Sequence, residues 1–549
     1  MRFINKLIYA VALSVLPLMG IAQSKEQPKT NWQNLDLTQD GVFGISTEKA
    51  YANLLRGKPS KPVIVAVIDG GIDEEHEDLK SVMWINAKEL AGNGIDDDKN
   101  GYIDDINGWN FIGSAKGSVQ YDNTELTRLI AKLQPKYSAA LNSTPFSEKE
   151  RVEFLSYQKM IAAYMDELQK ARMGSENTFL FNKYLGEMMA KMKKTDPTLA
   201  DFEAYKPASE IEGRVLKAVK SELKKNPDFS KLKEDIKEGL KYYDTMLKYH
   251  LNLDYNSRGL VGDNYSNRNE RNYGNSDVTG PDAEHGTHVS GIVAASRANN
   301  VGIKGVADNV RIMKIRAVPD GDERDKDVAN AIRYAVDNQA KIINMSFGKS
   351  YSWDKRVVDD AVKYAMSKNV LLVHAAGNDG QNTDKENNFP NRLFVDSLGV
   401  NMGKAELWIE VGASGWKDDE DLVADFSNYG KKSVDVFAPG VKINSTMPDS
   451  KYKDNDGTSM ASPVVAGLAA MIWSYYPALS AAQVKEIIMN SVSKVDQKVK
   501  VKENGSSKKV AFDEVCVSGG IVNAYNAMLL ADKISQTNST ASKIESKSK

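Results

Sequence analysis

The stretch GTSMASPVVAG, from Gly457 to Gly467, carries the clearest chemical signal in this chain. It holds one serine, Ser459, among small residues at the start of an apolar helical run. The helix that follows would direct unpaired backbone N–H groups and the positive end of its dipole toward this serine. Because a serine hydroxyl is unreactive without a base, Ser459 predicts a nucleophile only if the chain also supplies that base.

Two further motifs supply the base and a partner for it. The segment VAVIDGGID, from Val65 to Asp73, predicts a buried strand of β-branched residues that ends at Asp69. The segment HGTHVSG, from His285 to Gly291, begins a second small-residue helix with a histidine at its first position. An aspartate, a histidine and a serine therefore follow one another in the order of the subtilisin triad, which differs from the order in chymotrypsin and in the α/β-hydrolases.

In order and in local sequence, the three motifs resemble those of the subtilisin-like serine endopeptidases. The resemblance covers roughly residues 40–113 and 277–528, well over half of the chain. It implies an α/β fold in which a parallel sheet carries helices on both faces, with the active site at the ends of strands. It also implies hydrolysis of peptide bonds in polypeptide substrates.

The resemblance gives each residue of the site a role. His285 would take the proton of Ser459 during attack on a peptide carbonyl and return it to the leaving amine, while Asp69 fixes the imidazole tautomer. Asn378, at the end of the string AAGN, would donate its side-chain amide to the oxyanion. The residues that the resemblance assigns to an extended substrate and to the primary specificity pocket are Ser346, Gly348, Ala376 and Gly377.

Each motif alone has a plainer interpretation, such as a helix start, a strand followed by a turn, or a strand end with an asparagine turn. Four of them in the right order make those interpretations much weaker. An alternative function comes from another class: an exported interaction protein that uses a subtilisin-like scaffold and a helical insert for partner binding. The joint presence of Asp69, His285, Ser459 and Asn378 favours the enzyme.

Outside these motifs, strand-like and helix-like segments alternate, as an α/β domain with a parallel sheet requires. The predicted strands are residues 311–317, 342–345, 370–375, 408–413 and 434–438. The predicted helices are residues 325–338, 355–367 and 481–491.

A long charged segment separates the aspartate and histidine motifs, and its apolar residues recur at helical spacing. The apolar stripes lie in residues 126–133, 152–168, 179–192, 209–225 and 232–247. Four or five amphipathic helices can bury such stripes against one another, so we predict an inserted α-helical subdomain over residues 114–256. A solvated spacer and a surface for a protein partner are equally compatible with this segment.

The predicted organisation has six parts. They are a signal peptide at 1–22, an N-terminal segment at 23–39, the two parts of the catalytic domain at 40–113 and 257–531, the helical insertion at 114–256, and a flexible tail at 532–549 rich in Ser, Thr and Lys. The segment 23–39 is too short for the folded propeptide that the resemblance would imply.

Residues 1–22 predict export, since basic residues precede an apolar centre and small residues precede a cleavage site before Gln23. We therefore expect a periplasmic, cell-surface or extracellular protein with no transmembrane segment in the mature chain. The single cysteine, Cys516, has no partner for an internal disulfide. A net charge of −2 and the lack of a long basic tract argue against nucleic acid as a partner.

Calcium is the expected stabilising ion in an exported chain without disulfides, because Ca²⁺ binds several carboxylate, amide and carbonyl oxygens. The resemblance implies one calcium site that joins Asp78, shortly after the catalytic aspartate, to Asn299 in the loop after the histidine helix. Both residues lie in segments that would have to meet in the folded chain.

A second candidate calcium site is visible in GNGIDDDKNGYIDD, from Gly92 to Asp105. The spacing D-x-D-x-N-G-x-x-D repeats the first nine positions of a calcium-binding loop. Asn107 stands where the bidentate glutamate of an EF-hand would be, so an EF-hand is not predicted. A solvated turn is the alternative. The predicted ligands are Asp96, Asp98, Asn100 and Asp104.

Overall fold

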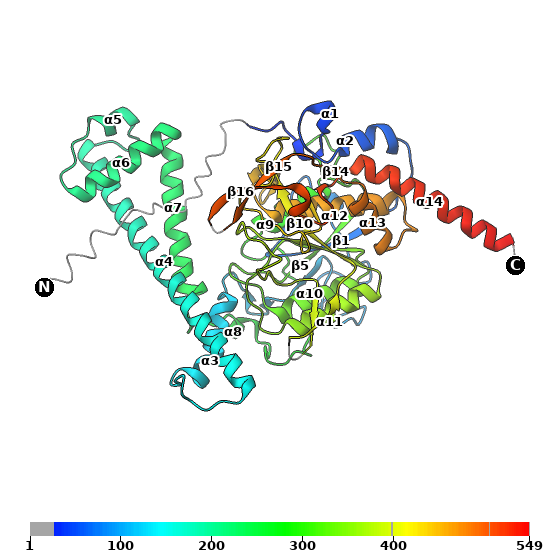
Figure 1. The fold of residues 1–549 in the computed structure, drawn as a ribbon, viewed down its shortest axis with the longest axis horizontal. Helices are drawn as coiled ribbons and strands as arrows, with labels where there is room; N and C mark the ends of the chain where they lie inside the picture. The colour runs from blue at the N-terminus through cyan, green and yellow to red at the C-terminus, as the bar shows by residue number, and fades with distance from the viewer. Residues whose placement is uncertain (1–26, 397–398, 504, 548–549) are drawn as a thin grey trace. The chain divides into compact units, whose positions relative to one another are not determined.

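The computed structural model describes residues 27–396, 399–503 and 505–547. Their contacts form two compact units (Figure 1). One unit contains Leu126–Tyr255, and the other joins Pro28–Glu125 to Asn256–Lys549. The predicted signal peptide, 1–22, lies outside the described residues.

The larger unit is built on a nine-stranded sheet with the strand order β14-β17-β11-β10-β7-β6-β1-β5-β2. Every neighbouring pair is parallel except β14 and β17. The strands are β1 (Val63–Asp69), β2 (Gly108–Asn110), β5 (Val310–Arg316), β6 (Ile342–Met345), β7 (Leu371–Ala375), β10 (Trp408–Ser414), β11 (Val436–Pro439), β14 (Ser493–Lys494) and β17 (Gly520–Ile521). The mostly parallel sheet confirms the predicted α/β class.

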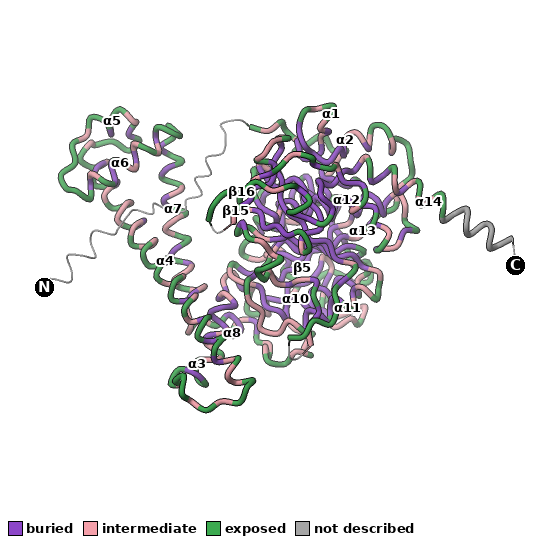
Figure 2. Tube along the Cα trace, in the orientation of Figure 1, coloured by how far each residue is buried: buried purple, intermediate pink, exposed green. Residues whose placement is uncertain are grey.

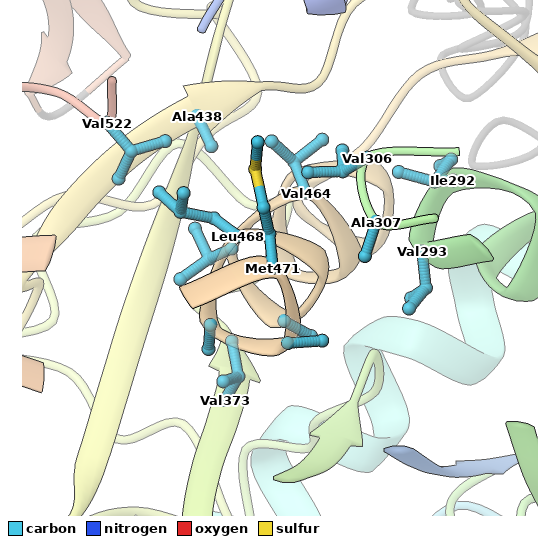
Figure 3. Packing of buried hydrophobic residues seen from close by; sticks show 14 of the residues in the cluster. Ile292, Val293, Val306, Ala307, Val373, Ala438, Val464, Leu468, Met471 and Val522 are labelled. Carbon is cyan, nitrogen blue, oxygen red and sulfur yellow. The ribbon is translucent and has the colours of Figure 1, made fainter. Parts of the chain in front are cut away.

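One face of the sheet is covered by helices α9 (Glu284–Ala294), α12 (Thr458–Tyr475) and α13 (Ala481–Asn490) and by the start of α14 (Ala524–Lys547). Side chains alternate along β1, so Val65 and Val67 join this core. Figure 3 shows Leu468 and Met471 of α12 at its centre. The alanines of α12 are fully buried, which lets the helix lie directly on the strands.

The opposite face is covered by α10 (Asp325–Asp337) and α11 (Lys355–Ser367). Ala66 and Ile68, the alternate residues of β1, pack into this second core. Figure 2 shows buried residues along the sheet strands and α12. Because both faces are covered, the strands are nearly continuous apolar runs, which is why their positions could be predicted from sequence.

Shorter elements complete this unit. They are α1 (Leu37–Asp40), α2 (Thr47–Ala50), α8 (Arg258–Val261), and four antiparallel pairs: β3 (Gly113–Ser114) with β4 (Gly117–Ser118), β8 (Leu393–Val395) with β9 (Asn401–Lys404), β12 (Ile443–Met447) with β13 (Lys451–Asn455), and β15 (Lys498–Glu503) with β16 (Ser506–Ala511).

The smaller unit is helical, as predicted. Its helices are α3 (Glu125–Tyr137), which begins one residue before the unit, α4 (Glu148–Met192), α5 (Leu199–Ala204), α6 (Glu210–Lys225) and α7 (Phe229–Thr245). Helices α4 to α7 enclose a core of their own around Met188, Phe202, Val219 and Ile236. Ser147 begins α4 with a capping box, in which its hydroxyl and the Glu150 side chain satisfy each other's backbone N–H groups.

The predicted helical stripes 152–168 and 179–192 form one continuous helix, α4. The expectation of four or five helices left open whether these stripes share a helix, and Gly174, which lies between them, serves packing and does not end the helix. A Cβ at Gly174 would lie 2.2 Å from the ring of Tyr243 on α7, so glycine lets the two helices approach closely. The helix ends only at Lys193, which adopts the left-handed conformation.

The segment predicted as a flexible tail, 532–549, has a helical backbone as far as Lys547, as the continuation of α14. Its Ser, Thr and Lys content offers little to a packed core, which motivated the prediction. The segment also contains no Gly or Pro, so nothing in it ends the helix that begins at Ala524.

Candidate active site

Asp69 is the last residue of β1, at the carboxyl edge of the sheet, where open α/β sheets bind their ligands. Only 2% of the residue is exposed. Its Oδ1 accepts a hydrogen bond from the backbone N–H of Gly70 at 2.8 Å. The strand end therefore holds a fixed, buried carboxylate.

His285, near the start of α9, lies directly against this carboxylate. Its Nδ1 is 2.8 Å from Oδ1 and 2.9 Å from Oδ2 of Asp69. Because an ionised carboxylate only accepts, Nδ1 carries the proton and Nε2 is the basic nitrogen. The next residue, Gly286, makes this approach feasible, since a Cβ there would lie 2.3 Å from the carbonyl oxygen of Gly71.

The pKa of His285 is set by opposing effects. Desolvation of the ring lowers the pKa, but the charge of Asp69, the hydrogen bond to Asp69 and the charge of Asp282 together raise it above its ordinary value. The side chain is still 45% exposed, so the ring remains accessible from solvent. His285 therefore has the tautomer and the exposure that a general base needs.

The neighbouring histidine, His288, is fully buried on α9, and its Nε2 lies 3.0 Å from the carbonyl of Lys453. Burial lowers the pKa of His288 to about 4. Nε2 therefore donates to that carbonyl, and the ring is neutral at neutral pH. His288 joins α9 to β13 and is not a second base.

Ser459 is the second residue of α12, which packs against α9. Its hydroxyl donates to the carbonyl of Ser346 at 3.0 Å, while the Ser346 hydroxyl donates to the carbonyl of Ser459 at 2.9 Å. Within the described residues the Ser459 hydroxyl thus bonds to the segment after β6 and not to His285. The hydrogen bond between a nucleophile and its base is often long in a free enzyme and shortens with substrate.

Sequence reasoning missed Asn344, a fully buried residue of β6 that supports this contact. Its Nδ2 donates to the Ser346 hydroxyl at 3.0 Å, and its Oδ1 accepts from Ser462 at 2.8 Å. Asparagine is rare inside a buried strand, so its presence in INMSFG was the available signal. The network ties the first turn of α12 to β6.

Asn378 follows β7, and its amide has a defined orientation. Its Oδ1 accepts from the backbone N–H and from the hydroxyl of Thr458, both at 2.9 Å. Since the backbone N–H can only donate, the oxygen must face Thr458 and the NH₂ group must face elsewhere. That nitrogen lies 3.6 Å from where a Cβ on Gly457 would be, close to the start of α12.

Two further asparagines hold the AAGN segment and were not predicted. Asn428 donates to the carbonyl of Ala376 at 2.9 Å and accepts the N–H groups of Asp379 and Gln381. Asn388 donates to the same carbonyl at 3.1 Å. Asn388 lies 12 residues and Asn428 lies 52 residues beyond Ala376, so neither belongs to the AAGN motif from which the site was predicted.

The predicted substrate-binding residues lie on the segments next to Ser459 and Asn378. The N–H of Gly377 donates to the Thr458 hydroxyl at 3.1 Å, and Ala376 is fully buried behind it. Gly348 is exposed beyond the end of β6, and its backbone N–H and C=O have no backbone partner within the described residues. An unpaired edge of this kind can accept an extended chain as an added strand.

Asp78 and Asn299, predicted as calcium ligands, are brought together. Asp78 is fully buried, and its Oδ1 accepts from Asn299 Nδ2 at 2.6 Å. Its Oδ2 accepts from the N–H of Ile303 at 2.9 Å. Both carboxylate oxygens thus have protein donors, and a cation at this position would have to displace them. The calcium site at Asp78 and Asn299 stays a prediction.

The predicted calcium ligands of the acidic loop, residues 92–105, fall into two groups in the structure. Oxygens of Asp96 and Asp98 lie close together and are joined by one from Glu89. The other two predicted ligands have partners elsewhere: Asp104 accepts from the N–H groups of Asn93 and Gly94, and Asn100 donates to Asp105 and accepts from the N–H of Tyr102.

Comparisons with known proteins define the family. The model of the Subtilase family matches residues 60–512. The Thermophilic serine proteinase of Bacillus sp. (strain AK1) is 44% identical over 191 residues, which are 35% of this chain and 42% of that protein. Subtilisin DY of Bacillus licheniformis is 37% identical over 210 residues, which are 38% of this chain and 70% of that protein. The chain therefore belongs to the subtilase family.

Among solved structures, a protease from Pseudoalteromonas arctica PAMC 21717 is 28% identical, with a TM-score of 0.38 over 47% of this chain and 78% of that one. In the described part of the chain, no helix combines the length and the apolar character needed to cross a bilayer.

Proposed function

We propose that this chain is an exported serine endopeptidase that hydrolyses peptide bonds in polypeptide substrates. The observation that carries the proposal is the pairing of His285 Nδ1 with both carboxylate oxygens of Asp69, at 2.8 and 2.9 Å, in a subtilase chain that retains Ser459 at a helix start. This pairing leaves His285 Nε2 free of its proton for use as a base.

The reaction begins when the Ser459 hydroxyl exchanges its bond to the Ser346 carbonyl for one to His285. His285 Nε2 takes the proton as Oγ attacks the substrate carbonyl, and the imidazolium is stabilised by the Asp69 carboxylate. The same proton then passes to the leaving amine. Water repeats the sequence on the acyl-enzyme and releases the acid.

The developing oxyanion needs preorganised donors. We assign the Asn378 amide nitrogen and the backbone N–H of Ser459 to this task. The amide is suited to it because Thr458 occupies only its oxygen end. The substrate would lie along Ser346 to Gly348, with Ala376 and Gly377 beside the side chain that precedes the cleaved bond.

Export and calcium binding complete the proposal. The basic and apolar pattern of residues 1–22 supports export to the periplasm, the cell surface or the medium. A calcium ion at Asp78 would displace the hydrogen bond that Asn299 Nδ2 donates to this carboxylate, and the Asn299 amide would then present its oxygen to the ion. A protein partner for the helical insertion stays a prediction.

The direct test is labelling with a fluorophosphonate probe, which reacts with an activated serine. The full chain should label, the Ser459→Ala variant should not, and Ser506→Ala, which changes an exposed serine of β16, should label like the parent. Peptide hydrolysis should follow the same pattern. A parent protein that neither labels nor hydrolyses peptides would favour the interaction protein over the enzyme.

A further inference from the structure

The acidic loop holds two of its carboxylates in fixed positions. Asp96 accepts the N–H of Asn100 at 3.0 Å through Oδ1 and that of Gly101 at 2.8 Å through Oδ2. Asp98 Oδ1 also accepts the N–H of Asn100, at 3.1 Å. These contacts orient the carboxylates but neutralise neither of them.

A third carboxylate reaches this pair from outside the predicted loop. One oxygen each from Glu89, Asp96 and Asp98 lies within 4.8 Å of the others. Glu89 is only 6% exposed, and its Oε1 accepts the N–H of Asp98 at 3.0 Å. Its Oε2 is buried and has no hydrogen-bond partner within the described residues.

The three carboxylates also have no ion-pair partner among the residues that the structure describes. No lysine or arginine in the described ranges forms an ion pair with Glu89, Asp96 or Asp98. Three like charges at this separation repel one another, and a buried carboxylate oxygen without a donor is unfavourable. A bound cation would reduce the repulsion among the carboxylates and would also give the buried Glu89 oxygen a partner.

We propose that Glu89, Asp96 and Asp98 together bind a divalent cation. The donor set is oxygen only and carries three negative charges, which selects a hard ion such as Ca²⁺ over metals that prefer nitrogen or sulfur. The site differs from the one that the loop spacing predicts, since Glu89 replaces Asn100 and Asp104. It goes beyond the proposed protease activity and does not depend on it.

Such a cation would be linked to the body of the sheet. Asn86 Nδ2 donates to Asp98 Oδ2 at 3.2 Å and to Asp105 Oδ1 at 2.8 Å. Asp105 in turn accepts the hydroxyl of Tyr334 on α10 at 2.6 Å. The ion would thus fix a long surface loop to a helix of the second core, in a chain without disulfides.

The test measures binding and does not need hydrolysis. The full chain with Ser459→Ala, which prevents self-digestion, and Asp78→Asn, which silences the other predicted calcium site, is freed of metal with a chelator and titrated with CaCl₂ by calorimetry. We expect one site, and Glu89→Gln or Asp96→Asn should raise its Kd by about tenfold or more.

Asp104→Asn is the matched control, because this carboxylate lies in the same loop but caps the Asn93–Gly94 turn. It should leave the Kd unchanged. Glu89→Gln should reduce the rise in Tm that calcium causes, yet melt no lower than its parent in chelator, since it relieves repulsion. A Kd unaffected by Glu89→Gln, or a Tm lowered equally with and without calcium, would overturn the proposal.

Discussion

The proposed contribution of Asn378 to catalysis can be measured separately from that of the other residues of the candidate site. Thr458 fixes its oxygen, so only its nitrogen is available to an oxyanion. We expect Asn378→Ala to reduce kcat about 10²–10³-fold with little change in KM, the magnitude known for the equivalent donor in subtilisin itself. Steady-state kinetics on a peptide substrate would measure the loss.

Asn378→Asp provides the control for structure. It keeps an acceptor for Thr458 but lacks the amide donor, so its Tm should match the parent while kcat falls at least as far as in the alanine variant. Near-normal kcat in Asn378→Asp would mean that the amide does not stabilise the oxyanion.

The pH dependence of activity should report the environment of His285. Only the neutral ring can accept the proton of Ser459, and Asp69 raises its pKa against the opposing effect of desolvation. We therefore expect kcat/KM to fall, as pH decreases, around a pKa above about 6.5, the ordinary value for histidine.

Asp69→Asn removes the negative charge and the carboxylate hydrogen bond that raise the pKa of His285. The desolvation that lowers this pKa remains. The residual activity of this variant should consequently lose its acid limb at a lower pH than the parent does. A pH profile that keeps its acid limb at the parent position in Asp69→Asn would argue against control of His285 by Asp69.

The residues of the proposed triad could be identified from the sequence because each lies in a short motif, and the order of these motifs along the chain is that of the subtilisin triad. Asn388 and Asn428 could not, although they hold the segment that carries Asn378, and the sequence signal for Asn344 was only its place in a predicted buried strand. Asn344 reaches Ser462, which lies 118 residues further along the chain, and the Ala376 carbonyl lies 52 residues before Asn428 and 12 before Asn388. Glu89 belongs to the same class, since only the folded chain shows its approach to Asp98.

Among the elements, helix α4 offers a test with an internal control. Gly174 faces the ring of Tyr243, whereas a Cβ on Gly186 in the same helix would meet nothing within 4 Å. We expect Gly174→Ala to destabilise the helical unit by about 1–3 kcal/mol through overpacking. Gly186→Ala should instead stabilise it by about 0.5–1 kcal/mol, because alanine restricts the unfolded chain and favours helix.

Hydrogen exchange of amides in residues 126–255, measured in the full chain, would give both values. Stabilisation by Gly174→Ala equal to that of Gly186→Ala would show that Tyr243 does not pack against α4. Destabilisation by Gly174→Ala together with stabilisation by Gly186→Ala would establish that Gly174 is a packing residue.

The boundaries of the sheet strands could be predicted from the sequence more precisely than those of the helices in the insertion. Buried parallel strands are short apolar runs bounded by polar residues, so residues 342–345 were located to the residue. In α4 the stripe pattern left open whether two stripes belong to one helix or to two. Whether a glycine ends a helix or admits a neighbour depends on what packs against it, which the stripe pattern does not contain.

At the scale of the whole chain, the two compact units have separate hydrophobic cores. The ligands proposed for both cation sites, Asp78 with Asn299 and Glu89 with Asp96 and Asp98, all belong to the larger unit. Calcium should therefore stabilise that unit alone. This makes the helical unit an internal reference within the same molecule.

Hydrogen exchange of the Ser459→Ala protein, compared in calcium and in chelator, tests this expectation. A site held at a hundredfold excess of calcium over its Kd stabilises the folded unit by about 2.7 kcal/mol, so amides in the sheet strands that exchange only by global unfolding should slow about a hundredfold. Amides of α4 and α7 should exchange at the same rate in both conditions. An equal slowing of both sets would mean either that the units unfold together or that calcium acts without specific sites, and unchanged strands would exclude a stabilising cation.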